Sequence, residues 1–228
     1  MKLYTSEQMR ALDAAAIEGL GIPSLTLMGN AASHVVRAAE KLCACESRSA
    51  AVFMGSGNNG GDGAAAACGL LADGYCVRLF LVGKRDRMTP DTAEYVRRFH
   101  EAGGEAESFD PASAEIRAYV SNCGVIIDAM FGIGLNSDLR APAKDAAELI
   151  NDSGIPVVAA DIASGVEADT GRILGGAVRA DVTVTFTAAK PGQITEPGCL
   201  YTGELEVRNI GIPQSLFSQM ETKVFTVT

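Results

Sequence analysis

Four short segments of the chain combine glycines with amide, carboxylate or hydroxyl side chains. They lie at residues 55–63, 128–138, 161–171 and 187–192. Each follows an apolar run that is typical of a buried strand. A parallel sheet would bring all four segments to the edge at which open α/β proteins bind their ligands. We therefore expect one site built from all four.

The segment at residues 55–63 reads GSGNNGGDG and contains the spacing G-x-G-x-x-G. Glycines at this spacing let backbone amides approach a phosphate, and the start of the next helix favours an anion. A dinucleotide-binding turn also predicts an acidic residue after the following strand, but residues 83–85 read Gly-Lys-Arg. The spacing alone is therefore weak evidence. The amides of Asn58 and Asn59, together with the Asp62 carboxylate, favour a ligand-binding role over a plain glycine turn.

Asp128 and Asp161 each follow a buried apolar run. A buried carboxylate is costly unless it is paired, hydrogen-bonded or bound to a cation. Asp128 either caps nearby backbone amides or serves a functional site. Together with Asn59 and Ser164, the two carboxylates supply hard oxygen ligands suited to a monovalent cation or to Mg²⁺.

Asp161 is also the candidate acid/base group, because a partly desolvated carboxylate titrates nearer to neutrality. A bound cation would favour its ionised form, in which case Asp161 would orient the substrate as an acceptor. In the fourth segment, Lys190 is suited to a ligand phosphate or to a carboxylate, and equally to an exposed loop. The sequence leaves these alternatives open.

The elements that position these segments alternate between strands and helices. Apolar runs predict strands at residues 50–54, 77–82, 125–127, 156–160 and 182–186. Helical patterns lie at about 63–73, 90–102, 112–121 and 142–152. This alternation is typical of βαβ units around a mostly parallel sheet. Without repeats or linkers, the chain is predicted to be a single domain over residues 1–228.

Two further helices are expected before the first strand. Residues 5–8 read Thr-Ser-Glu-Gln, which resembles a capping box, and a second helix is predicted to run to about Cys45. We expect these helices to cover the sheet or to form an oligomer contact.

Composition narrows the class of protein further. Hydrophobic residues make up 47% and charged residues 21%, and the 19 Lys and Arg against 28 Asp and Glu give a net charge of −9. An acidic chain repels phosphate backbones, so no nucleic-acid partner is expected. No run approaches the roughly 18 apolar residues of a membrane span, and no secretory signal is visible. The six cysteines are scattered through apolar segments, which predicts reduced core thiols and a cytoplasmic location.

Taken in order, the motifs resemble the NAD(P)H-hydrate epimerase family, also known as the YjeF N-terminal domain family. The resemblance rests on GSGNNGGDG at 55–63, DAMFGIGL at 128–135, DIASGVEADTG at 161–171, AAKPG at 188–192 and GELEVRNIGIP at 203–213. It implies a three-layer α/β/α Rossmann-like fold and an enzyme that interconverts the R and S epimers of hydrated NADH or NADPH (NADHX or NADPHX). It also implies a homodimer with one potassium ion per subunit.

The resemblance assigns roles to particular residues. Asp161 is the implied catalytic residue. The implied potassium ligands are Asn59, Asp128 and Ser164. The implied substrate contacts are Asn58, Asn59, Gly60, Gly61, Asp62, Gly132, Ile133, Gly134, Leu135, Asn136, Ser137, Asp138 and Asp161.

Four positions depart from the family pattern. Gly29 stands where Glu is usual, Cys68 where Arg is frequent, Ala163 where Pro is usual and Glu167 where Asp is usual. The carboxylate missing at Gly29 is expected to alter either the site or a dimer contact. Because the implied catalytic residue and potassium ligands are all present, we expect activity to survive.

Two alternatives come from other classes of protein. A non-catalytic nucleotide-binding or scaffold domain would share the fold, and an NAD(P)-dependent oxidoreductase would use the glycine turn. The resemblance also raises the expectation that the chain is the epimerase half of a longer protein. Its partner would then be a fused or separate ATP- or ADP-dependent NAD(P)H-hydrate dehydratase, with the strand-like residues 223–228 leading into it.

Overall fold

The centre of the protein is one parallel sheet. The computed structural model describes residues 2–43 and 48–218 of the 228-residue chain. Seven strands lie in the order β3-β2-β1-β4-β5-β6-β7, and every neighbouring pair is parallel. The strands are β1 (Ser49–Met54), β2 (Cys76–Leu81), β3 (Ala106–Ser108), β4 (Val125–Ala129), β5 (Val157–Ala160), β6 (Val182–Phe186) and β7 (Glu204–Arg208).

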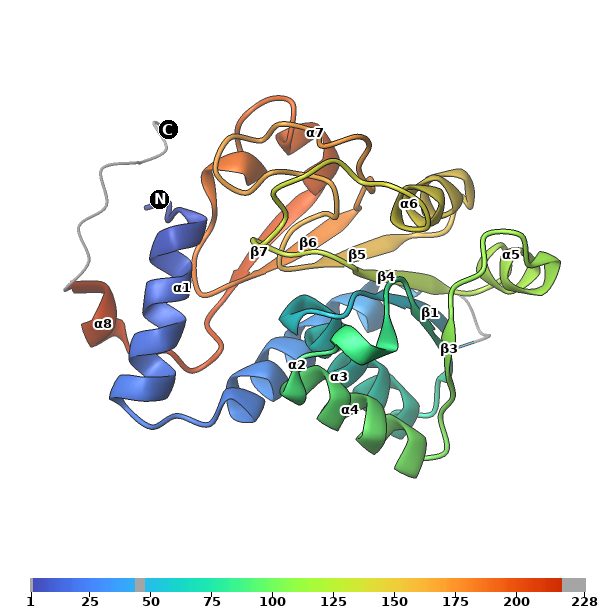
Figure 1. The fold of residues 1–228 in the computed structure, drawn as a ribbon, viewed down its shortest axis with the longest axis horizontal. Coiled ribbons are helices and arrows are strands. Elements are labelled where there is room, and N and C mark those ends of the chain that lie inside the picture. Colours follow the sequence, from blue (N-terminus) through green and yellow to red (C-terminus); the bar gives the residue numbers. More distant parts are fainter. Residues whose placement is uncertain (1, 44–47, 219–228) are drawn as a thin grey trace.

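Helices cover both faces of this sheet and give it three layers (Figure 1). One face carries α2 (Ser24–Leu42), α3 (Asn58–Ala72) and α4 (Pro90–Glu101). The other carries α5 (Ala114–Val120) and α6 (Ala143–Asp152), and the short α7 (Cys199–Thr202) lies on this side of the sheet in the same view. The first six strands of the order match the doubly wound Rossmann arrangement. The predicted α/β/α fold is therefore confirmed.

Successive residues of a strand enter opposite cores, which explains why the strands lack polar alternation. In β1, Val52 and Met54 pack with the α2–α3–α4 layer, whereas Ala51 and Phe53 pack with the α5–α6 layer. All four are fully buried. Two buried cores thus hold the sheet rigid behind the loops at its carboxyl edge.

The chain begins with a helix that lies beside the sheet rather than on it. Helix α1 (Ser6–Ala14) starts at the predicted capping box, in which Thr5 accepts from the amide of Gln8 and the Gln8 side chain accepts from the amide of Thr5. Its buried face packs against Ala188, and Leu3 pairs with Ala189. Figure 1 shows α1 next to α8 (Gln214–Ser218) at one end of the molecule. Of the two N-terminal helices, α2 covers the sheet and α1 flanks the loop after β6.

Several predicted details are wrong. The edge strands β3 and β7 were not predicted, because their polar and partly exposed residues hide the apolar signal. Helix α3 begins at Asn58 rather than at about residue 63, since tertiary packing overrides the poor helix propensity of glycine. Strand β4 continues through Asp128, which pairs with Phe53 and Ala159, so this carboxylate lies inside the sheet.

The cysteines are less buried than predicted. The five described cysteines are free thiols, but only Cys123 is buried and Cys76 is exposed. Helix α2 ends at Leu42, and Cys45 lies outside the described residues, as does the predicted strand at 223–228. Within residues 2–43 and 48–218, no helix has the length and apolar character to cross a membrane.

Candidate active site

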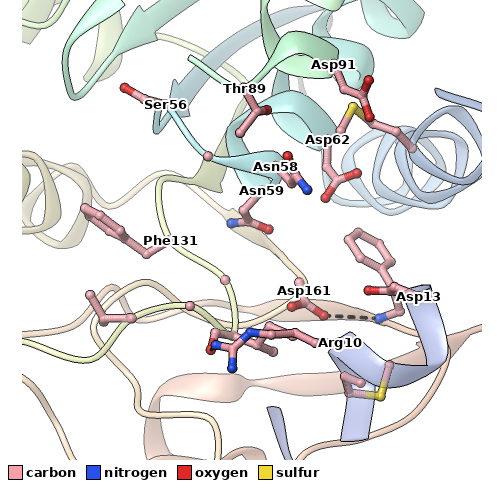
Figure 2. A pocket seen from close by; sticks show the side chains of 18 of the residues that line it. Arg10, Asp13, Ser56, Asn58, Asn59, Asp62, Thr89, Asp91, Phe131 and Asp161 are labelled. Carbon is pink, nitrogen blue, oxygen red and sulfur yellow. Dashed lines mark hydrogen bonds between the residues drawn. The ribbon is translucent and has the colours of Figure 1, made fainter. Parts of the chain in front are cut away.

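A pocket of about 810 Å³ opens along the carboxyl edge of the sheet. Its wall combines residues that follow β1, β2, β4, β5 and β6 with one face of α1. Figure 2 shows Asn59, Asp62, Asp161 and Asp13 among the residues that line this pocket. The four segments singled out in the sequence therefore do converge on one site.

Asp161 and Lys190 form a buried ion pair in the pocket wall. Lys190 Nζ lies 2.5 Å from Asp161 Oδ1, and it also donates to Thr185 Oγ1 at 2.7 Å and to the Phe186 carbonyl at 3.1 Å. The Lys190 side chain is 1% exposed and that of Asp161 is 11% exposed. All three ammonium protons are thereby used. Of the alternatives open for Lys190, the structure shows a carboxylate partner and not a solvated loop lysine.

The backbone of Asp161 is held in a conformation that few residues adopt. Its φ is 65°, in the left-handed region that Asp tolerates better than most side chains. Its amide donates to the Val184 carbonyl at 2.8 Å, and its carbonyl accepts from Gln193 Nε2 at 2.7 Å. The sharp turn at the end of β5 thus directs the carboxylate into the pocket.

Two more carboxyl groups face the same pocket with raised pKa values. Burial, followed by the nearby Asp161 carboxylate, raises the pKa of Asp13 to about 6, although Lys190 opposes the shift. The same causes, together with Asp13 itself, raise the pKa of Asp62 well above its usual range. The pocket therefore contains one carboxylate with a cationic partner and two carboxyl groups inclined to keep a proton. Such divergent environments are typical of acid/base sites.

Two buried polar side chains of the pocket wall have no hydrogen-bond partner in the described part of the protein. They are the Asn59 amide, at both its oxygen and its nitrogen, and the Thr187 hydroxyl. Buried polar groups are nearly always hydrogen-bonded, so such atoms call for a ligand. Gly132 lies between Asn59 and Asp161, since a Cβ built on it would meet Asn59 Oδ1 and Asp161 Oδ2 at 3.2 Å each. The missing side chain at Gly132 keeps this space open.

Asp128 and Ser164 are fully buried and hydrogen-bonded to each other, and neither lines the pocket. Asp128 accepts from the Ser164 hydroxyl at 2.6 Å, from the Ser164 amide at 2.8 Å and from the Met130 amide at 3.2 Å. Ser164 Oγ also accepts from the Phe131 amide at 2.9 Å. Burial raises the pKa of Asp128 to about 6 despite these bonds. The structure thus shows the amide-capping role that was one of the two readings of Asp128.

No cluster of three or more His, Cys, Asp or Glu side chains suitable for a metal occurs in residues 2–43 and 48–218. A monovalent cation needs fewer charged ligands, and the unpartnered Asn59 oxygen is a hard donor of the kind it takes. Asn59 lines the pocket, whereas Asp128 and Ser164 do not line it and accept hydrogen bonds from the amides of Met130 and Phe131, which do. These donors fit a potassium ion in their chemical type.

The structure brings only some of the implied substrate contacts to the pocket. Asn58, Asn59, Asp62, Asp161 and residues 132–135 line it. Gly60 and Gly61 are instead buried in the first turn of α3, where a Cβ on Gly60 would lie 1.9 Å from the Gly55 carbonyl oxygen. Residues 136–138 are exposed and lie outside the pocket wall.

Comparison with known proteins identifies the family. Residues 24–192 match the family described as YjeF-related protein N-terminus. An NAD(P)H-hydrate epimerase of Limosilactobacillus reuteri is 36% identical over 210 residues, which cover 91% of this chain and 95% of that protein. The chain belongs to the YjeF-related N-terminal family.

Other members of the YjeF-related family extend the comparison. A bifunctional NAD(P)H-hydrate repair enzyme Nnr of Thermofilum pendens is 40% identical over 227 residues, 99% of this chain. The chain spans only 43% of that relative. The crystal structure of yeast YNL200c superposes with a TM-score of 0.81 at 22% identity, covering 100% of this chain and 98% of the yeast chain. The yeast structure shows the same fold.

The departures from the YjeF-related pattern lie away from the pocket wall. Gly29 is in α2, and a Cβ there would lie 2.9 Å from the Tyr95 hydroxyl, which donates to the Leu25 carbonyl. Cys68 is in α3 and contacts the Tyr95 carbonyl at 3.6 Å. Ala163 is buried in a small apolar cluster with Ile162 and Val166, and Glu167 accepts a hydrogen bond from Thr170. The space of the usual Glu side chain at position 29 is therefore taken by a tyrosine.

Sequence reasoning missed Asp13 and Gln193 as parts of the site. Asp13 carried a signal that was available, because Met9, Asp13 and Ile17 recur every four residues and all line the pocket. An acidic residue within such an apolar stripe is expected to lie at a buried site rather than in solvent. Gln193 follows the fourth segment and depends on the turn that brings its side chain to the Asp161 carbonyl, which no local pattern predicts.

Proposed function

We propose that this chain is an NAD(P)H-hydrate epimerase that interconverts the R and S forms of NADHX and NADPHX. One observation carries the proposal: Asp161, which is paired with Lys190, faces the Asn59 amide across Gly132, and this amide has no partner in the described part of the protein. Two protonatable carboxyl groups complete the same pocket. The names of the L. reuteri and T. pendens relatives support this assignment.

The reaction inverts C6, the carbon of the reduced pyridine ring that carries the hydroxyl. The lone pair of the adjacent ring nitrogen forms a C=N bond while the C6–O bond breaks, and the departing hydroxyl takes a proton to leave as water. Water then adds to the opposite face of C6 and gives up a proton as the C=N electrons return to nitrogen. No electron is gained or lost, so the enzyme needs only proton donors and acceptors.

The residues of the pocket divide these tasks. Asp62, whose pKa is raised by burial and by its neighbouring carboxylates, keeps a proton that it can give to the leaving hydroxyl. Asp161, held by Lys190, accepts the proton of the incoming water. The Asn59 amide nitrogen offers a donor and the Thr187 hydroxyl an acceptor for a carboxamide on the ring. The first turn of α3, whose amides are not capped by a side chain, receives the pyrophosphate.

We also propose one potassium ion per subunit, held by Asn59, Asp128 and Ser164. When bound, the ion would supply a fixed positive charge opposite the Asp128 carboxylate. The unpartnered Asn59 oxygen supports this proposal, and Ser164 and Asp128 are the further oxygen donors that the resemblance assigns to the ion.

The proposal is tested by chromatography of mixed NADHX epimers, starting from purified R or S form. Catalytic amounts of the protein should speed the approach to equilibrium well beyond the spontaneous rate, and Asp161→Asn should remove most of that acceleration. An unchanged rate of equilibration with the folded protein would instead favour a non-catalytic binding domain.

Three further expectations stay predictions. They are the homodimer, the cytoplasmic location, and cooperation with a fused or separate ATP- or ADP-dependent hydrate dehydratase. The bifunctional relatives, of which this chain spans less than half, support the last of these. Such a dehydratase would consume the S form while this chain replenishes it from R. Purified alone, the chain should not restore reduced-cofactor absorbance when ATP or ADP is added.

A further inference from the structure

Two cationic side chains without a role in the chemistry line the outer end of the pocket. Lys84 and Arg87 follow strand β2 and are exposed to solvent. In the part of the chain that the structure describes, neither side chain makes an ion pair or hydrogen bond. Arg85, between them, differs because its guanidinium donates to the Ala106 carbonyl at 2.9 Å. In a chain with a net charge of −9, two uncompensated cations at one pocket mouth favour an anionic ligand.

The backbone that carries Lys84 is fixed against the glycine-rich turn. Ser56 Oγ donates to the Lys84 carbonyl at 2.9 Å and accepts from the Lys84 amide at 3.2 Å. The Thr89 amide donates to the Ser56 carbonyl at 3.0 Å. A Cβ on Gly83 would lie only 2.6 Å from Ser56 Oγ, so the two loops are in close contact. Lys84 is therefore held at a constant distance from the proposed pyrophosphate site.

The order of the strands determines which part of a dinucleotide reaches this end. Along the sheet edge, Lys84 follows β2, the glycine-rich turn follows β1, and Asp161 follows β5. β2 and β5 are three strand intervals apart, at about 4.8 Å each. A dinucleotide with its nicotinamide ring at Asp161 and its pyrophosphate at the start of α3 extends its adenosine ribose over β2. This is the place where Rossmann proteins distinguish the ribose 2′-hydroxyl from a 2′-phosphate.

The groups at this place suit a phosphate rather than a hydroxyl. The carboxylate that would accept from a 2′-hydroxyl is missing directly after β2, where residues 83–85 read Gly-Lys-Arg. Among the acidic residues of the pocket wall, Asp91 is the one nearest along the chain. Figure 2 places Asp91 on the side of Asp62, across Thr89 from Ser56. Asp86 is exposed and does not line the pocket.

We infer that Lys84 and Arg87 form a subsite for the 2′-phosphate, so that the protein prefers NADPHX to NADHX. This inference rests on the proposed epimerase function for the identity of the substrate. Arg87 can bind the phosphate through two parallel N–H donors, and Lys84 adds a point charge.

Steady-state epimerisation of both substrates tests the inference. The unaltered protein should show a higher kcat/KM for NADPHX. In Lys84→Met/Arg87→Met, kcat/KM for NADPHX should fall roughly tenfold to a hundredfold, because charge-assisted hydrogen bonds are lost. The value for NADHX should stay within about threefold, since the chemistry at Asp161 is untouched. Arg85→Met is the matched control and should leave the ratio of the two substrates unchanged.

Binding of two dead-end probes separates this inference from the proposed function. By calorimetry, adenosine 2′,5′-bisphosphate should bind more tightly than adenosine 5′-monophosphate, and the double variant should lose the difference. If neither hydrate is epimerised but the bisphosphate preference persists, the proposed function fails while the subsite stands. Equal affinity for both probes, or a substrate ratio unaffected by Lys84→Met/Arg87→Met, would overturn the subsite.

Discussion

Lys190 Nζ and Asp161 Oδ1 are 2.5 Å apart in the wall of the pocket, and the lysine is 1% exposed. A buried ammonium of this kind needs its counter-ion, because an uncompensated charge in a protein interior is strongly destabilising. The carboxylate that is proposed to accept the proton therefore also stabilises the fold.

Asp161→Asn should remove most epimerisation and also lower the free energy of unfolding by about 3 kcal/mol, since Lys190 is left without its partner. Lys190→Met should cost a similar amount. The double variant should lose less stability than the sum of the two, as urea unfolding of the three variants would reveal. Strictly additive losses would mean that the two groups do not stabilise each other.

Asp13 should make stability depend on pH. Burial and the Asp161 carboxylate raise its pKa to about 6, above the roughly 3.9 of an unfolded chain. The folded state therefore holds the proton more tightly, and the contribution of Asp13 to stability declines as pH rises from about 4 to 6. Asp13→Asn should flatten this decline and gain on the order of 1–2 kcal/mol at neutral pH. Thermal unfolding of both proteins from pH 4 to 8 measures this pH dependence. Parallel curves of stability against pH would contradict the raised pKa of Asp13.

Asn59 should couple potassium binding to stability. Its amide makes no hydrogen bond in the described structure, so Asn59→Ala should change the melting temperature little in choline chloride. Potassium chloride at equal ionic strength should raise the melting temperature of the unaltered protein but not that of the variant. Asn58→Ala is the control, because this neighbour lines the pocket without belonging to the proposed ligand set. A potassium shift that survives in Asn59→Ala would exclude Asn59 as a ligand.

The glycine-rich turn should tolerate a methyl group at one position and not at another. A Cβ on Gly60 would lie 1.9 Å from the Gly55 carbonyl oxygen, whereas a Cβ on Gly57 meets nothing within 4 Å. Gly60→Ala should therefore cost about 2–4 kcal/mol through backbone displacement, and Gly57→Ala less than about 0.5 kcal/mol. Denaturant unfolding compares the two. Equal stability of these variants would show that the close approach of Gly60 to Gly55 does not contribute to the stability of the fold.

Much of the fold could be predicted because the central strands are uniformly apolar. Val52, Ile127 and Val158 are fully buried, and apolar runs of this kind indicate parallel strands between helices. The edge strands could not be predicted in this way. In β7, Glu204 and Arg208 are exposed, so the strand is held by its backbone pairing with β6 and by few buried side chains.

The site could be predicted only where a motif marks the end of a strand. Asp161 and Asn59 belong to such motifs and do reach the pocket. The sequence could not predict that Lys190 is the partner of Asp161, because no local pattern around Lys190 distinguishes a buried ammonium from an exposed one. Asp13 was missed because it enters from α1, an element outside the sheet whose position depends on residues 188 and 189.

That position of α1 has a consequence for biosynthesis. Leu3 pairs with Ala189, and Ser6 donates to Asp169 from both its amide and its hydroxyl. In a growing chain, Leu3 and Ser6 therefore have no docking place until residues 169–189 have been synthesised. Contacts so distant along the chain form slowly, because the intervening loop must close before they stabilise anything. The wall of the pocket that α1 contributes is thus completed only after residues 169–189 have been synthesised, and until then Asp13 has no fixed position relative to Asp161.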